Sequence, residues 1–81
     1  MPDLVSERLI TCFQNVFAGL DRTNIPSARQ ADIAAWDSIA HVTLLSVIGE
    51  EFGIDIDFED FETATSFPTI LEFVQARIAN G

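Results

Sequence analysis

The 81 residues suffice for one domain with a single small core, which stabilises a fold by only a few kcal/mol and leaves little room for an elaborate enzyme cleft. Hydrophobic residues make up 48% of the chain, which is too many for a disordered acidic tail, so the charge must lie on a folded surface. Four arginines, no lysine and 13 acidic residues give a net charge of -9, which argues against nucleic acids and anionic membranes as partners.

The first predicted element is an amphipathic helix that ends near Gly19. Its apolar residues recur at spacings of three and four, which is typical of a helix with one buried face. They are Val5, Leu9, Cys12, Phe13, Val16, Phe17 and Leu20. Residues 21–36 then mix Asn, Pro, Ser and small residues without a period and predict a long connection. We expect Ile25, Ile33 and Trp36 to fix this connection to the core.

A second helix is predicted over residues 38–52, with Asp37 as its N-cap and Gly53 as its C-terminal cap. Residues 54–66 alternate briefly as a strand would, but no other segment offers a strand that could pair with them. A loop that leads into a short helical turn around residues 58–62 is therefore the better interpretation.

The last predicted helix follows Ser66, which suits its N-cap, and has Pro68 in its first turn and Gly81 past its end. Helical spacing recurs along this segment, at Phe67, Ile70, Leu71, Phe73, Val74 and Ile78. The sequence thus predicts an all-α fold, a small four-helix bundle of three main helices and one short helix with a long first loop. Residues 1–81 are expected to form a single domain.

Cys12 is the only cysteine, which excludes an internal disulfide and a zinc site with paired cysteines. A buried, inert thiol is expected. No uncharged apolar stretch approaches the length that spans a membrane, and no charged segment followed by an apolar run opens the chain. We therefore expect a cytoplasmic monomer that does not insert into membranes.

The second predicted helix carries two apolar faces. The stripe that suits the bundle core consists of His41, Leu44, Leu45, Ile48 and Phe52. Ile39 and Val42 lie on another face, roughly 140° away at 100° per residue. This second face either packs under the long loop or is a docking surface for a partner, and we favour docking.

Ser38 is the first residue of the same helix. Its hydroxyl lies near free backbone N–H groups and the positive end of the helix dipole, where a phosphate ester would be stabilised. Position alone favours the simpler interpretation of a serine that follows a good cap. Eight acidic residues and no basic one lie from Asp37 to Glu62, which indicates either a solvated surface or a face for basic protein partners.

The stretch WDSIAHVTLLSVIGEEFGIDI, followed by acidic residues, a short gap and an S…ILEFV helix, resembles the acyl carrier protein family. In that family an Asp-Ser-Leu or Asp-Ser-Ile motif marks the serine that receives 4'-phosphopantetheine. The tripeptide alone is a weak signal. Its place near the middle of an acidic chain of this length, with EEFGI at the right distance, makes the combination specific, and the likeness covers essentially the whole chain.

The resemblance implies that a phosphopantetheinyl transferase, using coenzyme A and Mg²⁺, attaches 4'-phosphopantetheine to Ser38. It also implies that Asp37 helps to hold the Mg²⁺ or to orient the transferase. The chain itself is then no enzyme: an acyl- or aminoacyl-loading ligase charges the thiol of the arm, and a downstream synthase or transferase takes the cargo. Partners of this family commonly present Arg and Lys. The residues expected to dock them are Ile39, Val42, Glu50, Glu51, Asp55, Asp57, Glu59, Asp60 and Glu62.

The chain departs from two branches of the family. Carriers of fatty-acid synthesis usually place acidic residues along the start of the second helix, where this chain has Ala40 and Thr43. Aminoacyl and peptidyl carriers of large synthetases more often have Gly-Gly before the residue that precedes the serine, where this chain has Ala35 and Trp36. We therefore expect a dedicated carrier of a specialised or secondary pathway.

A calcium-loop interpretation rests on Asp55, Asp57 and Glu59, which stand at alternate positions as in an EF-hand. That loop needs a glycine at its sixth position and a glutamate at its twelfth, where this chain has Asp60 and Ser66. The pattern predicts weak surface binding of divalent cations and no specific site.

Two further interpretations remain. Ser38, His41 and Asp37 could form a hydrolase triad, but Asp37 at the helix cap is poorly aimed to orient the imidazole. The other is an acidic helical interaction module that keeps the fold without a prosthetic group. Attachment of pantetheine to Ser38 separates the carrier from both.

Overall fold

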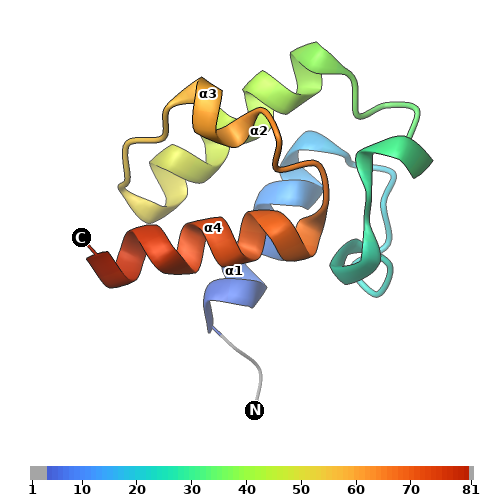
Figure 1. The fold of residues 1–81 in the computed structure, drawn as a ribbon. Helices are drawn as coiled ribbons and strands as arrows, with labels where there is room; N and C mark the ends of the chain where they lie inside the picture. The colour runs from blue at the N-terminus through green and yellow to red at the C-terminus, as the bar shows by residue number, and fades with distance from the viewer. Residues whose placement is uncertain (1–3, 81) are drawn as a thin grey trace.

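The computed structural model describes residues 4–80 and confirms the predicted all-α fold. Its α-helices are α1 (Leu4–Val16), α2 (Ser38–Phe52), α3 (Phe58–Phe61) and α4 (Phe67–Asn80). In the view of Figure 1, α4 crosses α1, while α2 and the short α3 lie above them. The connection between α1 and α2 lies at the right of this view and contains the 3₁₀ helices η1 (Ile25–Ser27) and η2 (Gln30–Asp32).

The prediction that the first helix ends near Gly19 is wrong, because α1 ends at Val16. One more helical hydrogen bond follows, from the Phe17 N–H to the Phe13 carbonyl at 2.7 Å. The Leu20 N–H then bonds the Phe17 carbonyl at 3.0 Å, the tighter spacing of a 3₁₀ turn. The low helix propensity of glycine explains why the helix stops before Gly19. The chain turns away from the helix axis at this point.

The long connection is fixed to the start of α4 by backbone hydrogen bonds. The Gln30 N–H bonds the Thr65 carbonyl and the Phe67 N–H bonds the Ala28 carbonyl, both at 2.9 Å. These bonds flank an isolated antiparallel bridge, and within residues 4–80 no strand forms around it. As predicted, Ile25 is buried in the core, and Ile33 packs against it. The connection is thus a well-bonded part of the fold.

Both predicted ends of α2 are confirmed. Gly53 has a φ of 64°, the left-handed conformation that glycine adopts without a steric penalty, and its N–H bonds the Gly49 carbonyl. The Ile54 N–H reaches the same carbonyl at 3.1 Å. The Gly49 carbonyl thus accepts two hydrogen bonds from the turn, and the end of the helix gains partners that it would otherwise lack.

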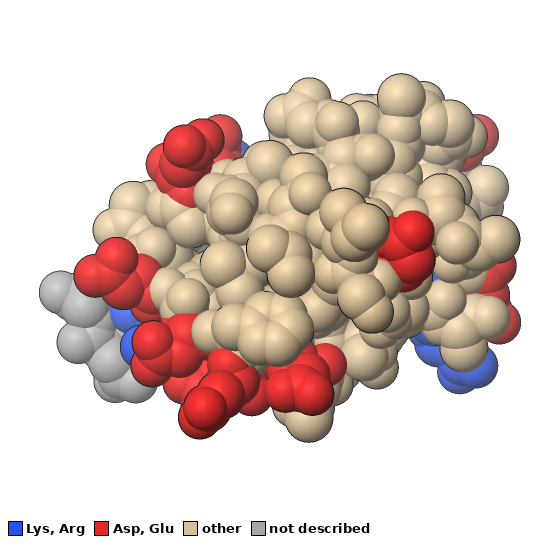
Figure 2. Space-filling model, turned by 90° about the horizontal axis from the view of Figure 1, so that it is seen from above, with Lys and Arg blue, Asp and Glu red and all other residues tan. Residues whose placement is uncertain are grey.

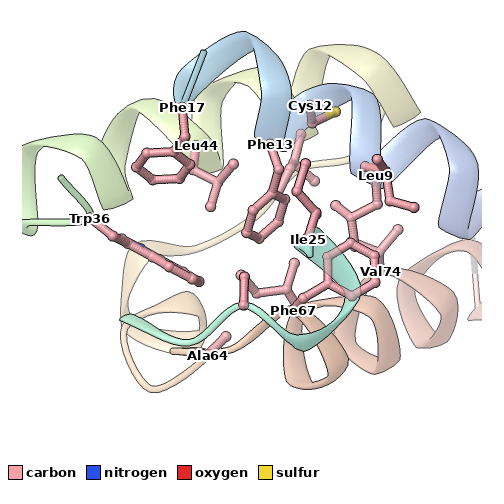
Figure 3. Packing of buried hydrophobic residues seen from close by; sticks show 14 of the residues in the cluster. Leu9, Cys12, Phe13, Phe17, Ile25, Trp36, Leu44, Ala64, Phe67 and Val74 are labelled. Carbon is pink, nitrogen blue, oxygen red and sulfur yellow. The ribbon is translucent and has the colours of Figure 1, made fainter. Parts of the chain in front are cut away.

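A single cluster of buried side chains joins all four helices and the long connection. Phe13 lies at its centre, in edge contact with Trp36 (ring centroids 5.4 Å apart) and with Phe67 (5.3 Å), as Figure 3 shows. Such edge contacts are favourable because the ring edge is positive and the ring face negative. Trp36 therefore belongs to the core although it lies only two residues before α2, as its predicted anchoring role requires.

Ser66 caps α4 as predicted, since its Oγ accepts the Thr69 N–H at 3.3 Å and its carbonyl accepts the Ile70 N–H at 3.0 Å. Pro68 lies in the first turn of α4, where its missing N–H costs nothing. The predicted helix stop at Gly81 lies outside the described residues. Within residues 4–80, no helix combines the length and the apolar character needed to cross a membrane.

Candidate functional site

Asp37 caps the helix that carries the candidate serine. Its backbone is extended, and its Oδ1 accepts the Ala40 N–H at 2.8 Å. Its carbonyl accepts the His41 N–H at 2.9 Å, which is the first hydrogen bond of the helix. The N–H groups of Ser38 and Ile39 belong to the same first turn, where the helix itself supplies no carbonyl partner. The start of α2 is thus well ordered and retains N–H groups that can face an anion.

Ser38, Ile39 and Val42 form an exposed group on the first turns of α2. Ser38 is exposed, and the relative exposures of Ile39 and Val42 are 78% and 46%. Side chains three or four positions apart are neighbours on a helix, so Val42 adjoins both other residues. The alternative that Ile39 and Val42 pack beneath the long connection is therefore wrong, and the predicted second face of α2 is open to solvent.

His41 is buried directly behind this exposed group, with a relative exposure of 4%. Its Nδ1 accepts the Trp36 indole N–H at 2.9 Å, and its Nε2 lies 2.9 Å from the Phe61 carbonyl. Because Nδ1 is the acceptor, the ring proton sits on Nε2 and is donated to Phe61. The imidazole also stacks on the Phe61 ring at a centroid distance of 4.5 Å. These contacts join the long connection, α2 and α3.

The geometry of His41 opposes the triad interpretation. A serine hydrolase needs an imidazole nitrogen that faces the serine hydroxyl and a carboxylate on the other nitrogen. In this structure Trp36 and Phe61 occupy both nitrogens, while Asp37 directs Oδ1 to a backbone N–H. His41 is a structural residue that supports the start of α2.

The arginines divide the predicted docking acids into two groups. Arg8 pairs with Glu51 at 2.8 Å and Arg77 pairs with Asp60 at 3.1 Å. The other two arginines pair elsewhere, in Arg22–Glu7 and Arg29–Asp32. Among residues 4–80, five of the predicted docking acids take part in none of these ion pairs. Those five are Glu50, Asp55, Asp57, Glu59 and Glu62.

This division decides which charges a partner would meet. An acid that already pairs with an arginine offers a partner a smaller local field than an unpaired one. Figure 2 shows acidic side chains mainly along the margin of the face seen from above, and the broad area between them is largely uncharged. The uncharged area belongs to the side of the molecule on which α2 and α3 lie in Figure 1.

Sequence reasoning missed Phe58, the first residue of α3, whose side chain is 47% exposed. It adjoins the unpaired acids Asp57 and Glu59 in the chain. Phe58 and Phe61 stand three positions apart, which places them on neighbouring parts of one helical face, so the local spacing gave no signal that Phe58 is exposed. Phe61 is the buried member.

The carboxylates around α3 do not converge. Within the described part of the chain, no three side chains of His, Cys, Asp or Glu lie close enough to hold a metal ion together. Asp55, Asp57 and Glu59 are all exposed and border a short helix rather than a twelve-residue loop.

Cys12 is buried in the core, as predicted. The pKa of its thiol is raised from 9.0 to about 11, chiefly because burial leaves a thiolate poorly solvated. The charge of Glu51 also raises the pKa, while Arg8 and a backbone hydrogen bond lower it. The thiol is therefore protonated and unreactive at neutral pH.

The residues named from the sequence thus occupy two places along α2. Its start carries Asp37, Ser38, Ile39 and Val42. The unpaired acids begin at Glu50, about 18 Å further along the helix axis at 1.5 Å per residue.

Scans against models of protein families, curated proteins and solved structures found no match to the chain.

Proposed function

We propose that this chain is a carrier protein, with 4'-phosphopantetheine on Ser38 and an acyl or aminoacyl group held on the arm as a thioester. The supporting observation is the exposed Ser38 on a capped helix start, beside the exposed aliphatic side chains of Ile39 and Val42. The resemblance of the surrounding sequence to acyl carrier proteins selects this chemistry from the others that an exposed serine allows.

In the attachment step this chain supplies the nucleophile, which is the hydroxyl of Ser38. Its Oγ forms a bond to the phosphorus that bears the pantetheine part of coenzyme A, adenosine 3',5'-bisphosphate leaves, and the hydroxyl proton passes to a base of the transferase. The resulting phosphodiester is an anion at the positive end of α2, where the N–H groups of Ser38 and Ile39 favour it. Asp37 Oδ1 is engaged by Ala40, so its other oxygen is the one suited to Mg²⁺ in the complex with the transferase.

The surface around Ser38 suits brief contacts with several enzymes. Ile39 and Val42 offer apolar area beside the arm, and the unpaired acids Glu50 and Asp55 offer charge at the other end of α2. Charges of this kind raise encounter rates and set orientation more than they raise affinity. A carrier requires this combination, because it must release each partner after transfer.

Attachment is tested by intact-mass measurement after incubation with coenzyme A, Mg²⁺ and a transferase of broad specificity. We expect the wild-type chain to gain the mass of one phosphopantetheine group and Ser38→Ala to gain none. Ser46→Ala, an exposed serine on the same helix, is the matched control and should be modified like the wild type. Because Cys12 is buried and protonated, a thiol reagent should find no reactive thiol in the native unmodified chain and one after modification.

A wild-type chain that stays unmodified while an accepted carrier is modified in the same mixture would contradict the proposal. The acidic interaction module without a prosthetic group would then be the better interpretation. Modification that persists in Ser38→Ala would place the arm on another residue.

Replacing Ile39 with serine should slow this modification without unfolding the chain. An exposed substitution changes stability by about 0.5 kcal/mol or less, whereas loss of an aliphatic contact in a complex costs about 1 to 2 kcal/mol, or roughly a tenfold drop in kcat/KM. The measurement is kcat/KM of the transferase with each variant as substrate. Ile78→Ser, which removes an exposed isoleucine from α4, is the control and should leave kcat/KM unchanged. Equal effects of the two variants would show that Ile39 has no part in docking.

A further inference from the structure

The short helix α3 depends on its neighbours for its place in the bundle. It is four residues long, and an isolated helix of that length is not stable in water. The side chain of its N-cap, Asp57, makes no capping hydrogen bond. Contacts with α2 and α4 therefore decide where the side chains of α3 lie.

His41 supplies the contact from α2. Its Nε2–H donates to the Phe61 carbonyl at 2.9 Å, and its ring stacks on the Phe61 ring at a centroid distance of 4.5 Å. The same carbonyl accepts the Ala64 N–H at 2.9 Å, so the bond from His41 acts on the point at which α3 ends. Both rings are buried, and a buried hydrogen bond is costly to leave unmade. The end of α3 is thus fixed against the first turn of α2.

The contacts from α4 hold α3 less firmly. Arg77 pairs with Asp60 at 3.1 Å, but both side chains are more than a third exposed, and such pairs contribute little. Phe73 meets the Phe61 ring at a centroid distance of 6.1 Å, which is in the longer half of the usual range for an edge contact. His41 is therefore the firmer anchor of α3.

The anchored helix carries an exposed aromatic ring. Among residues 4–80, three of the five exposed large hydrophobic side chains lie on α2 and α3, namely Ile39, Val42 and Phe58. Phe58 stands one helical turn before Phe61, so its position follows that of α3, while Ile39 and Val42 belong to α2. The broad, largely uncharged area of Figure 2 lies on the side formed by these two helices. A partner that contacts both helices needs them in a fixed relation, and His41 supplies it.

We propose that His41 is a positioning residue for the attachment reaction: its bond to the Phe61 carbonyl holds Phe58 in place as a contact for the phosphopantetheinyl transferase. The inference rests on the proposed carrier function. Phe58 adds to the apolar contact that Ile39 makes beside Ser38, while His41 itself touches neither the enzyme nor the reacting atoms. Loss of the bond should weaken binding of the transferase and leave the chemical step unchanged, because Ser38 and the cap of its helix are not altered.

Two amide variants separate the two hydrogen bonds of the imidazole. The amide nitrogen of His41→Gln stands as many bonds from the backbone as Nε2 and can donate to the Phe61 carbonyl. The side-chain oxygen of His41→Asn stands in the same way for Nδ1 and can accept the Trp36 N–H. Each variant loses one buried hydrogen bond, so the two should lose similar amounts of stability, which urea unfolding measures.

The two variants should nevertheless differ as substrates of a broad-specificity transferase. We expect His41→Gln to keep the wild-type KM. His41→Asn should raise KM roughly fivefold to tenfold at an unchanged kcat, as for the loss of one well-placed aromatic contact. A residue that only stabilises the fold would change KM equally in both variants, and that result would overturn the proposal.

Phe58→Ser tests whether His41 acts through α3. This exposed substitution should raise KM as much as His41→Asn does, whereas the control Ile78→Ser on α4 should not. In the double variant, His41→Asn should add little to Phe58→Ser, because the side chain that His41 positions is already absent. Additive effects, or a Phe58→Ser variant with the wild-type KM, would overturn the proposal.

The tautomer of His41 tests the bond itself in the unsubstituted chain. His41 is the only histidine, so the ¹⁵N signals of its ring are assigned without ambiguity. We expect the proton on Nε2, and a proton on Nδ1 instead would remove the donor to Phe61 and overturn the proposal. This measurement and Phe58→Ser need no buried substitution, so each can overturn the proposal even if a variant of His41 does not fold.

Failure of this inference is distinguishable from failure of the carrier function. If no pantetheine is attached to the wild type, the carrier function fails, and this inference fails with it. If attachment succeeds and the two variants of His41 share one KM, the carrier function stands and His41 has no part in docking.

Discussion

Replacing Trp36 with phenylalanine should lower the free energy of unfolding by about 1 to 3 kcal/mol, although it retains an aromatic ring in the core. The indole N–H is the donor to Nδ1 of His41, and phenylalanine leaves this buried acceptor without a partner. For a domain of 81 residues such a loss is a large part of the total stability. Urea unfolding followed by far-ultraviolet circular dichroism measures it.

A double-mutant cycle with His41→Leu separates the hydrogen bond from the change in ring size. His41→Leu alone leaves the Trp36 N–H and the Phe61 carbonyl unpaired, whereas the double variant leaves only the carbonyl. The double variant should therefore lose about 1 to 2 kcal/mol less than the sum of the single losses. Phe17→Leu, at a neighbouring ring without this hydrogen bond, should combine with His41→Leu with a much smaller coupling. Additive losses for Trp36 and His41 would contradict the proposed role of their bond.

Local signals in the sequence predicted the helices, both ends of α2 and the start of α4. Asp37, Gly53 and Ser66 each act on backbone groups within a few residues, so their positions in the chain suffice to place a helix end. The apolar spacing in residues 38–52 likewise separated the buried stripe of α2 from the exposed Ile39 and Val42. The start of the candidate site was therefore predictable, because it is built from a cap and the first turns of one helix.

Contacts between distant residues were not predictable in this way. The bond from His41 to Phe61 spans 20 residues, and the ion pair of Arg8 with Glu51 spans 43. Nothing in the local pattern of either segment specifies the other. The division of the acids into paired and unpaired groups depends on such contacts, so the sequence could predict an acidic surface but not which of its charges are unpaired.

The end of α1 shows a third limit. Apolar spacing continues through Leu20, so periodicity alone extends the helix to Gly19. In the structure Phe17 keeps its buried place in the additional turn, while Ala18 and Gly19 are exposed. A turn of this kind satisfies the same apolar pattern as a helix, so periodicity alone does not separate the two.

The second large effect is expected at high pH. Between pH 9 and pH 11 the unmodified chain should lose about 2 kcal/mol of stability through Cys12. The pKa of this thiol is 9.0 ordinarily and about 11 in the folded chain, so in this range the unfolded chain releases its proton before the folded chain does. The unfolded state then binds fewer protons than the native state, and the free energy of unfolding falls as the pH rises. Urea unfolding at a series of pH values measures the fall.

The composition of the chain makes it simple to assign a pH dependence between pH 9 and pH 11 to one residue. Cysteine, tyrosine and lysine are the residue types whose ordinary pKa lies nearest this range, and the chain has no tyrosine and no lysine. Cys12 is therefore the side chain to which a change between pH 9 and pH 11 is assigned. Cys12→Ala should start from a lower stability at pH 8, because it leaves a small cavity in the core, but should keep that stability up to pH 11. Cys12→Ala has no thiol to ionise. An equal fall in its free energy of unfolding would therefore mean that another group is responsible.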